Sequence, residues 1–175
     1  YSKEHKPNPI VQMGLFMDSN GVPLAFSVFP GNESEQPSMI PLEKKLLNEF
    51  EIDKMVVCTD AGLGSAENRK FNDRLCRSFI TVQSIKKLKR FLQDFALSSN
   101  DWHLPEDENI YNLDEIESLD DEAFKSYYDK VFYKERWINE DNLEQRLIVT
   151  FSFKYRDYLR NIRAARVERA QKSID

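Results

Sequence analysis

An aspartate followed by a glycine turn is the feature of this sequence with the clearest chemical potential. Asp60 ends the short run 56–59, and Gly62 and Gly64 follow it. Valine and cysteine in that run favour a buried strand, and glycine lets the backbone turn sharply after it. Sites of open α/β sheets lie outside the carboxyl ends of their strands, so Asp60 is a candidate functional carboxylate. The alternative is that Asp60 closes the strand as an Asx-turn residue or caps the next helix.

Charge is distributed unevenly along the chain. The 175 residues carry a net charge of −5, which argues against a dedicated nucleic-acid-binding domain. The stretch 105–124 has nine acidic residues and no lysine or arginine, whereas 154–172 has seven basic residues and two acidic ones. A second basic cluster consists of Lys86, Lys87, Lys89 and Arg90. Such local basic faces either bind a phosphate backbone or are simply solvated helix faces.

Composition indicates a globular protein with a real hydrophobic core, since 41% of the residues are hydrophobic and 12% are aromatic. Cys58 and Cys76 have neither a disulfide pattern nor a metal-ligand spacing, so we expect a reducing, cytoplasmic location. No stretch approaches the roughly 20 apolar residues that span a bilayer, and we expect no membrane partner. Tyr1 is not a natural start, so we expect a fragment or a processed piece.

The elements that must position these residues alternate between strands and helices, which predicts an α/β architecture. A strong hairpin signal, Asn-Gly, lies in the turn 18–21. The acidic stretch 105–124 is expected to be a loop or a loosely ordered helix, and 139–142 to be a hairpin turn. Periodicity predicts strands at 10–17, 22–29, 54–59, 79–83, 131–138 and 146–153, and helices at 38–50, 66–75, 86–97 and 155–174.

Three segments together resemble the DDE transposases of bacterial insertion sequences. These segments are NPIVQMGLFMDSNGVPLAFSVFPGNESE, VVCTDAGLGSAENRKF, and RLIVTFSFKY with RAARVERA. The resemblance is strongest over residues 8–35 and 56–71. It implies a ribonuclease-H-like mixed sheet flanked by helices, in which roughly 86–145 form a β-rich insertion. Residues 1–175 would then be part of one catalytic core whose first strand precedes Tyr1.

The resemblance also implies an activity, namely metal-dependent DNA cleavage and strand transfer at the ends of an insertion sequence. Two aspartates and one glutamate would hold two Mg²⁺ or Mn²⁺ ions, which activate the attacking oxygen and stabilise the leaving oxygen. Asp60 matches the second aspartate and Glu168 the glutamate. The first aspartate is expected before Tyr1, because Asp18 lies in a hairpin turn. The chain alone is therefore expected to be inactive, although Asp60 and Glu168 should approach each other in the fold.

The expected partners are the DNA of the element ends and the target, and a second copy of the protein when both assemble on DNA. The residues we expect to contact DNA are Lys86, Lys87, Lys89, Arg90, Trp137, Arg160 and Arg163. Trp137 is included because an aromatic ring can stack on unpaired bases, with Lys134 and Arg136 supplying charge beside it. Helical spacing places Glu168 away from the apolar stripe of its helix. This position is as consistent with a solvent-exposed glutamate as with a metal ligand.

Two other hypotheses stay open. The chain could be a degenerate transposase that binds or assembles on DNA without catalysis. It could also be a different metal-dependent α/β hydrolase in which Asp60 and Glu35 are the ligands. That hydrolase would have Glu35, and not Glu168, beside Asp60.

Overall fold

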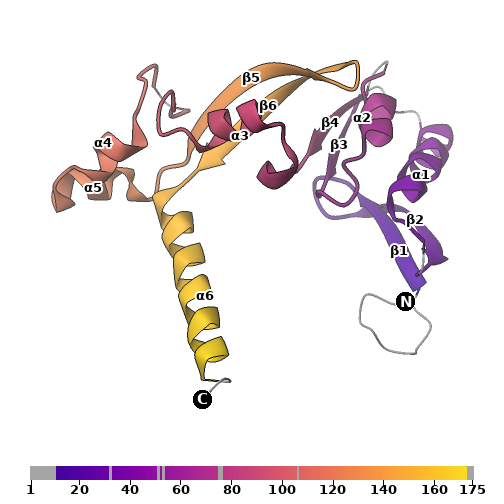
Figure 1. Ribbon diagram of the computed structural model, residues 1–175. Coiled ribbons are helices and arrows are strands. Elements are labelled where there is room, and N and C mark those ends of the chain that lie inside the picture. The colour runs from indigo at the N-terminus through magenta and orange to yellow at the C-terminus, as the bar shows by residue number, and fades with distance from the viewer. Residues whose placement is uncertain are drawn as a thin grey trace. The chain divides into compact units, whose positions relative to one another are not determined.

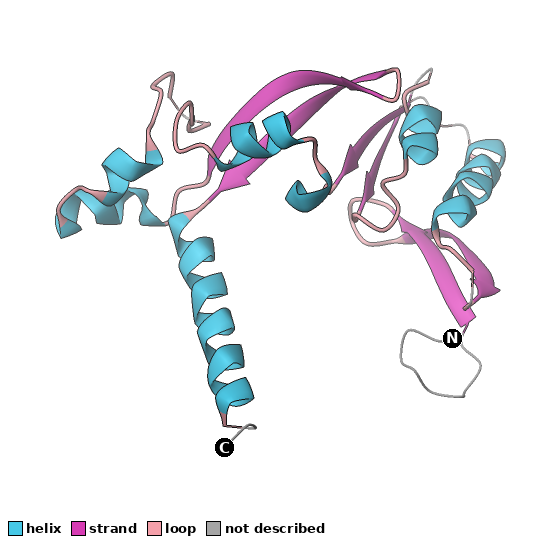
Figure 2. Cartoon of the chain, in the orientation of Figure 1, coloured by secondary structure: helices cyan, strands magenta, loops and turns pink. Residues whose placement is uncertain are grey.

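Helices and short strands alternate along the chain, and together they form the mixed α/β structure that the sequence predicts (Figures 1 and 2). The computed structural model describes residues 11–31, 33–50, 52, 54–74, 77–105 and 107–172. Contacts divide the chain into a first unit that ends at Leu88 and a second unit that begins at Lys89. The predicted element ends at Ile10, Leu75 and Ile174 lie outside the described residues, as does Cys76.

The first unit begins with the predicted antiparallel hairpin of β1 (Val11–Met17) and β2 (Pro23–Pro30). Asp18 closes its turn, because one carboxylate oxygen accepts hydrogen bonds from the backbone N–H groups of Asn20 and Val22, both at 2.8 Å. The bond from Val22, supported by those from Asn20 and Gly21, lowers the pKa of the exposed Asp18 carboxyl. The turn role predicted for Asp18 is confirmed.

Helix α1 (Gln36–Glu49) packs against this hairpin through Leu42 and Leu46, which form a small core with Ala25. The helix begins two residues earlier than predicted. Pro37 explains the difference, since proline is favoured in the first turn, where a backbone N–H has no intrahelical partner.

A parallel pair of strands follows, consisting of β3 (Met55–Thr59) and β4 (Arg77–Thr81). They are connected by α2 (Ala66–Asn72), which contacts both α1 and β4 (Figure 1). Helix α2 begins where predicted and ends earlier, because the guanidinium of Arg77 donates two hydrogen bonds to the carbonyl oxygen of Phe71, at 3.1 and 2.7 Å. A side chain that satisfies this last-turn carbonyl helps to end the helix.

Backbone ladders join β1 to β2 and β3 to β4, and the described residues contain no ladder between the two pairs. Each pair has one face towards α1 or α2 and another face that is apolar and exposed. The large exposed side chains of these outer faces are Val11, Met13, Leu15, Met17, Phe26, Val28, Val56, Ile80 and Val82. Strands with two apolar faces are typical of sheets that are covered on both sides.

The second unit is built around an antiparallel hairpin of β5 (Phe132–Glu140) and β6 (Leu143–Phe151). Both strands extend further towards the turn than predicted. The reason is a two-residue turn, since Asp141 and Asn142 both have positive φ, at 55° and 59°. Positive φ at both central residues is the geometry of the tight hairpin turn that matches strand twist.

The acidic stretch 105–124 is more ordered than expected. It contains α4 (Leu113–Glu117), and α5 (Asp121–Tyr128) begins within it. Each helix starts at a side-chain cap, Asn112 and Asp120 respectively, which accepts hydrogen bonds from two backbone N–H groups. These helices cover a core made of Trp102, Leu104, Leu113, Ile116, Phe132 and Phe153.

The predicted helix 86–97 is wrong in its first turn. Residues Ile85–Lys87 form a separate 3₁₀ turn, extended backbone follows at Leu88 and Lys89, and α3 covers only Arg90–Leu97. The last helix, α6 (Phe153–Gln171), begins two residues earlier than predicted, where the Ser152 hydroxyl accepts a hydrogen bond from a first-turn N–H.

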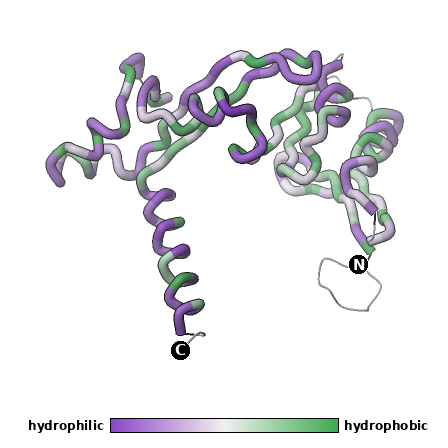
Figure 3. Tube along the Cα trace, viewed as in Figure 1, coloured by the Kyte–Doolittle hydropathy of each residue, from purple (hydrophilic) through white to green (hydrophobic). Residues whose placement is uncertain are grey.

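Helix α6 is hydrophilic along most of its length (Figure 3), and Phe153 is its buried residue. Its large apolar side chains Tyr155, Tyr158, Leu159 and Val167 are exposed. In the part of the chain that the structure describes, no helix has the length and hydrophobicity needed to cross a membrane.

Candidate functional site

Asp60 lies directly after the last residue of β3 and is exposed. Its Oδ1 accepts a hydrogen bond from the backbone N–H of Gly62 at 2.9 Å, and its carbonyl oxygen accepts one from Leu63 at 3.3 Å. Asp60 therefore closes an Asx turn, as one of the two alternatives predicted. The capping alternative is wrong, since the cap of α2 is Ser65, whose hydroxyl accepts a hydrogen bond from Asn68 N–H at 3.2 Å. An Asx turn uses one carboxylate oxygen and leaves Oδ2 available for chemistry.

Glu35 lies beside the Asp60 turn. A Cβ atom built on Gly62 would be 3.1 Å from Asp60 Oδ1 and 3.7 Å from Glu35 Oε2, so the two carboxylates line the same small surface. The other oxygen of Glu35, Oε1, accepts a long hydrogen bond of 3.4 Å from the amide of Gln12 on β1. We call Asp60 and Glu35 the carboxylate pair. Two carboxylates with additional waters are a typical protein contribution to a Mg²⁺ site.

The turn after β3 is held against the end of β4. Thr81 Oγ1 is within hydrogen-bond distance of the Asp60 carbonyl oxygen, at 3.3 Å, and of Thr59 Oγ1, at 3.0 Å. Gly64 passes so close to this hydroxyl that a Cβ atom would lie 2.7 Å from it. A larger residue at this position would therefore force the Thr81 side chain or the turn to shift.

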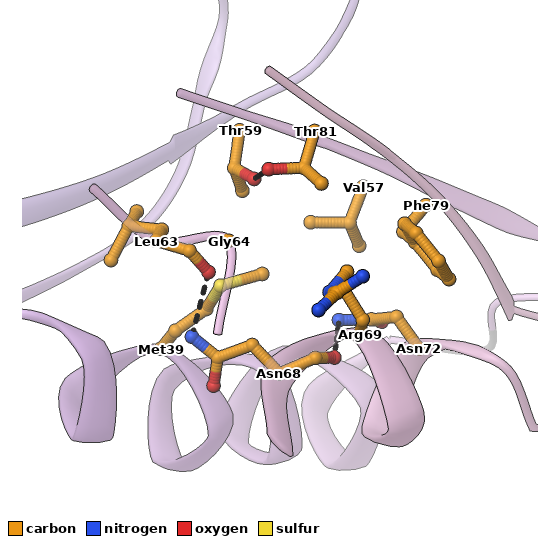
Figure 4. A pocket seen from close by; sticks show the side chains of 10 residues that line it. All are labelled: Met39, Val57, Thr59, Leu63, Gly64, Asn68, Arg69, Asn72, Phe79 and Thr81. Atoms are coloured by element: carbon orange, nitrogen blue, oxygen red, sulfur yellow. Dashed lines mark hydrogen bonds between the residues drawn. The ribbon is translucent and has the colours of Figure 1, made fainter. Parts of the chain in front are cut away.

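Behind the turn, a small cavity separates α2 from the strands (Figure 4). Its lining residues are Met39, Val57, Thr59, Leu63, Gly64, Asn68, Arg69, Asn72, Phe79 and Thr81. Next to it, Asn72 Nδ2 lies 3.0 Å from each carboxylate oxygen of Glu43, and both residues are fully buried. Burial raises the pKa of Glu43, although the Asn72 hydrogen bond and the charge of Arg77 act in the opposite direction.

The sequence reasoning missed Glu43, Asn68 and Asn72. One available signal was the position of Glu43 on α1, since it directly follows Leu42 and precedes Leu46 by three residues on the buried side of the helix. A carboxylate among buried positions requires a polar partner. Which residue would supply that partner depends on how α2 packs, and the local sequence does not contain this information.

Glu168 is exposed on α6, and its Oε1 accepts a hydrogen bond from Lys172 Nζ at 2.6 Å. This i,i+4 pair is the ordinary arrangement on a solvent-exposed helix face. Asp60 belongs to the first unit and Glu168 to the second, so their expected approach stays a prediction.

The basic residues predicted to contact DNA are exposed. Three of them form ion pairs: Lys89 Nζ lies 3.9 Å from Glu140 Oε1, Arg90 Nε 3.2 Å from Asp94 Oδ1, and Arg160 Nη1 3.6 Å from Asp157 Oδ1. Ion pairs at such exposed positions contribute little stability and are easily exchanged for another anion. Lys86 and Lys87 lie in the first unit, whereas Lys89, Arg90, Arg160 and Arg163 lie in the second.

Trp137 is 66% exposed, so its ring is accessible. The basic neighbours expected beside it are on the wrong face, because successive side chains of a strand point to opposite faces and Lys134 and Arg136 face α3. The basic residue beside Trp137 is instead Arg146, directly across the hairpin, which forms an ion pair with Glu135.

Lys134 is the most unusual basic residue of the second unit, with only 2% of its surface exposed. Its Nζ donates a hydrogen bond to the Ser98 carbonyl oxygen at 2.7 Å and lies 4.3 Å from the Trp102 ring centroid and 5.0 Å from that of Phe95. Burial lowers the pKa of Lys134, although the charge of Asp101 opposes this shift. The lysine thus connects β5, α3 and the loop after α3.

Across the described ranges, no group of three or more histidine, cysteine, aspartate or glutamate side chains is arranged to hold a metal ion. Comparisons with known protein families, with curated proteins and with solved structures find no match for this chain.

Proposed function

We propose that this chain is part of the catalytic core of an insertion-sequence DDE transposase with a ribonuclease-H-like fold, and that Asp60 is a metal ligand. The observation that carries the proposal is the position of Asp60. It is an exposed carboxylate at the carboxyl end of a parallel strand, and its turn is fixed by Gly62. That position is where α/β proteins place their sites. The three sequence segments that resemble transposases supply the substrate class, which is DNA.

In this proposal, two Mg²⁺ or Mn²⁺ ions activate the attacking water or 3′-hydroxyl and stabilise the leaving oxygen. The chain's own contribution is to hold the Asp60 carboxylate in a defined orientation. The hydrogen bond from Gly62 N–H fixes Oδ1, and the packing of the turn on Thr81 fixes the backbone. A ligand that is already oriented loses less conformational freedom when a metal binds.

The proposed partners are DNA at the element ends and at the target, and a second copy of the protein on that DNA, in the cytoplasm. Two surfaces of the second unit fit a DNA strand. The basic side of α6 offers Arg160 and Arg163 to phosphates, and the β5–β6 hairpin offers the exposed Trp137 ring with Arg146 opposite.

Changing both Arg160 and Arg163 to alanine is expected to flatten the salt dependence of binding to element-end DNA. Each lost phosphate contact should reduce the slope of log K against log salt concentration by about 1. The measurement is a salt series of fluorescence-anisotropy titrations. Changing Lys45 to alanine, which removes one side of an exposed helical pair with Glu49 in the first unit, is the control. An unchanged slope in the arginine variant would assign α6 to a surface away from DNA.

One observation favours a second candidate, which is a metal-dependent hydrolase that uses the carboxylate pair. Glu35 lies next to the Asp60 turn, as that hypothesis predicts, and both residues belong to the first unit. In contrast, Glu168 has Lys172 as its neighbour. The two candidates share Asp60 and differ in which glutamate completes the site.

Cleavage of element-end DNA by the complete protein, assayed with Mg²⁺, with Mn²⁺ and with EDTA, tests the proposal. We expect cleavage only with a divalent metal. Glu168→Gln should abolish cleavage if the transposase proposal is correct, whereas selective loss in Glu35→Gln would favour the second candidate. Glu49→Gln is the matched control, because Glu49 forms the same kind of exposed helical ion pair as Glu168. Cleavage that persists in EDTA would refute both.

A further inference from the structure

Asn68, in the first turn of α2, connects the two segments that carry the carboxylate pair. It is 3% exposed, and its Nδ2 donates two hydrogen bonds, to the carbonyl oxygen of Leu63 at 2.9 Å and to that of Gln36 at 3.1 Å. Figure 4 shows the bond to Leu63. Leu63 belongs to the turn that Asp60 begins, and Gln36 directly follows Glu35. A single amide group therefore bridges the two segments.

The bridge itself is firmly anchored. The backbone N–H of Asn68 donates to the Ser65 hydroxyl that caps α2, at 3.2 Å, and its carbonyl oxygen lies 3.3 Å from Asn72 Nδ2. Asn72 in turn contacts both oxygens of Glu43 on α1. Because the Asn68 amide is buried, losing it would remove the hydrogen bond that each of these two carbonyl oxygens receives from it.

We propose that Asn68 is a positioning residue for the carboxylate pair, which holds the Asp60 turn and Glu35 at a fixed separation. This inference rests on the proposed metal role of Asp60. The amide is suited to the role because it supplies two donor hydrogens from one nitrogen, and each is directed at a different segment. Alanine supplies no donor, and an ionised aspartate supplies none either. Hydrogen bonds to the ligands themselves typically alter metal affinity by about 10- to 100-fold, and Asn68 would act through the backbone of the two segments, at the lower end of this range.

The first measurement is independent of metal. Amide hydrogen exchange is compared by NMR for this chain and for Asn68→Ala. Exchange should become at least about tenfold faster at Leu63 and Ser38, whose N–H groups bond to the carbonyl oxygens of Asp60 and Glu35, and should stay unchanged in the β1–β2 hairpin. Asn112→Ala is the matched control, since Asn112 also carries a hydrogen-bonded amide side chain, caps α4 in the second unit and bonds to neither segment. Asn68→Asp, which has the same size, replaces Asn68→Ala if that variant does not fold.

The second measurement is Mn²⁺ affinity, determined by electron paramagnetic resonance. We expect Asn68→Ala to weaken binding by about tenfold or more, and Asn112→Ala to leave it within about twofold. Asp60→Asn shows whether the bound Mn²⁺ depends on Asp60. If Mn²⁺ binding does not depend on Asp60, the proposed function fails, and the exchange measurement still decides the role of Asn68. The same exchange pattern in Asn68→Ala and Asn112→Ala would overturn the positioning role.

Discussion

Asp60→Asn is expected to abolish metal-dependent DNA cleavage by the complete protein, with a loss of at least about 10³-fold. The substitution removes the charge that binds the cation, and metal stabilisation of the reacting oxygens contributes several kcal/mol to the rate. The fold should survive, because the asparagine side-chain oxygen can still accept the hydrogen bond from Gly62 N–H that defines the turn. Cleavage of labelled element-end DNA and its binding by gel shift are the two measurements, and binding should stay within about threefold of the wild type, since phosphate contacts dominate affinity.

Asp18→Asn is the matched control for that experiment. Asp18 is also an exposed aspartate that follows a strand and accepts backbone hydrogen bonds in a turn. If turn closure were the whole role of Asp60, both variants would behave alike and retain activity. Retained cleavage in Asp60→Asn would therefore assign Asp60 to the turn alone and would remove the basis of the proposed function.

Lys134→Ala is expected to cost the second unit about 2–4 kcal/mol of unfolding free energy. The change leaves a cavity between Phe95 and Trp102 and removes the donor to the Ser98 carbonyl. Lys134→Met should cost less than about 1.5 kcal/mol, since methionine keeps most of the volume and avoids burying a charge. The Ser98 carbonyl would still accept a hydrogen bond from Trp102 Nε1 at 2.9 Å. Urea unfolding followed by tryptophan fluorescence measures both variants, and equal losses would show that the charge, and not the packing, is essential.

The same lysine makes stability depend on pH. Burial lowers the pKa of Lys134 in the folded protein, so between that pKa and the ordinary lysine pKa of about 10.4 the unfolded state binds more protons. The contribution of Lys134 to the unfolding free energy should therefore rise with pH in this window. Lys134→Met should remove that rise, whereas Lys125→Met, at an exposed position of α5, should leave it unchanged. If the unfolding free energy of Lys134→Met rose with pH as steeply as that of the wild type, the role of Lys134 burial would be contradicted.

Local sequence patterns predicted much of the secondary structure. The Asn-Gly turn after Asp18, strand β3 and the start of α2 are where the sequence places them. These elements depend on contacts between residues that are neighbours in the chain, such as the carboxylate of Asp18 and the N–H of Val22. The errors occurred at element boundaries, which depend on proline positions, turn geometry and single side-chain contacts as well as on periodicity. Arg77, for example, helps to end α2 by bonding to Phe71, and sequence periodicity does not contain that contact.

Asp60 is the part of the candidate site that a local signal identified, because a carboxylate lies between an apolar run and two glycines, whereas Glu35 was named only as its partner in one hypothesis. Its surroundings depend on tertiary structure. Glu35 lies beside Gly62, and Asn68 bonds to Gln36 across 32 positions of the chain. Side chains alternate between the two faces of β5, but the sequence does not show which face is covered. In the structure Lys134 is buried against Trp102, whereas Trp137 is exposed. Which face of a strand or helix is covered is decided by packing between distant segments, and a single chain's local pattern does not specify that packing.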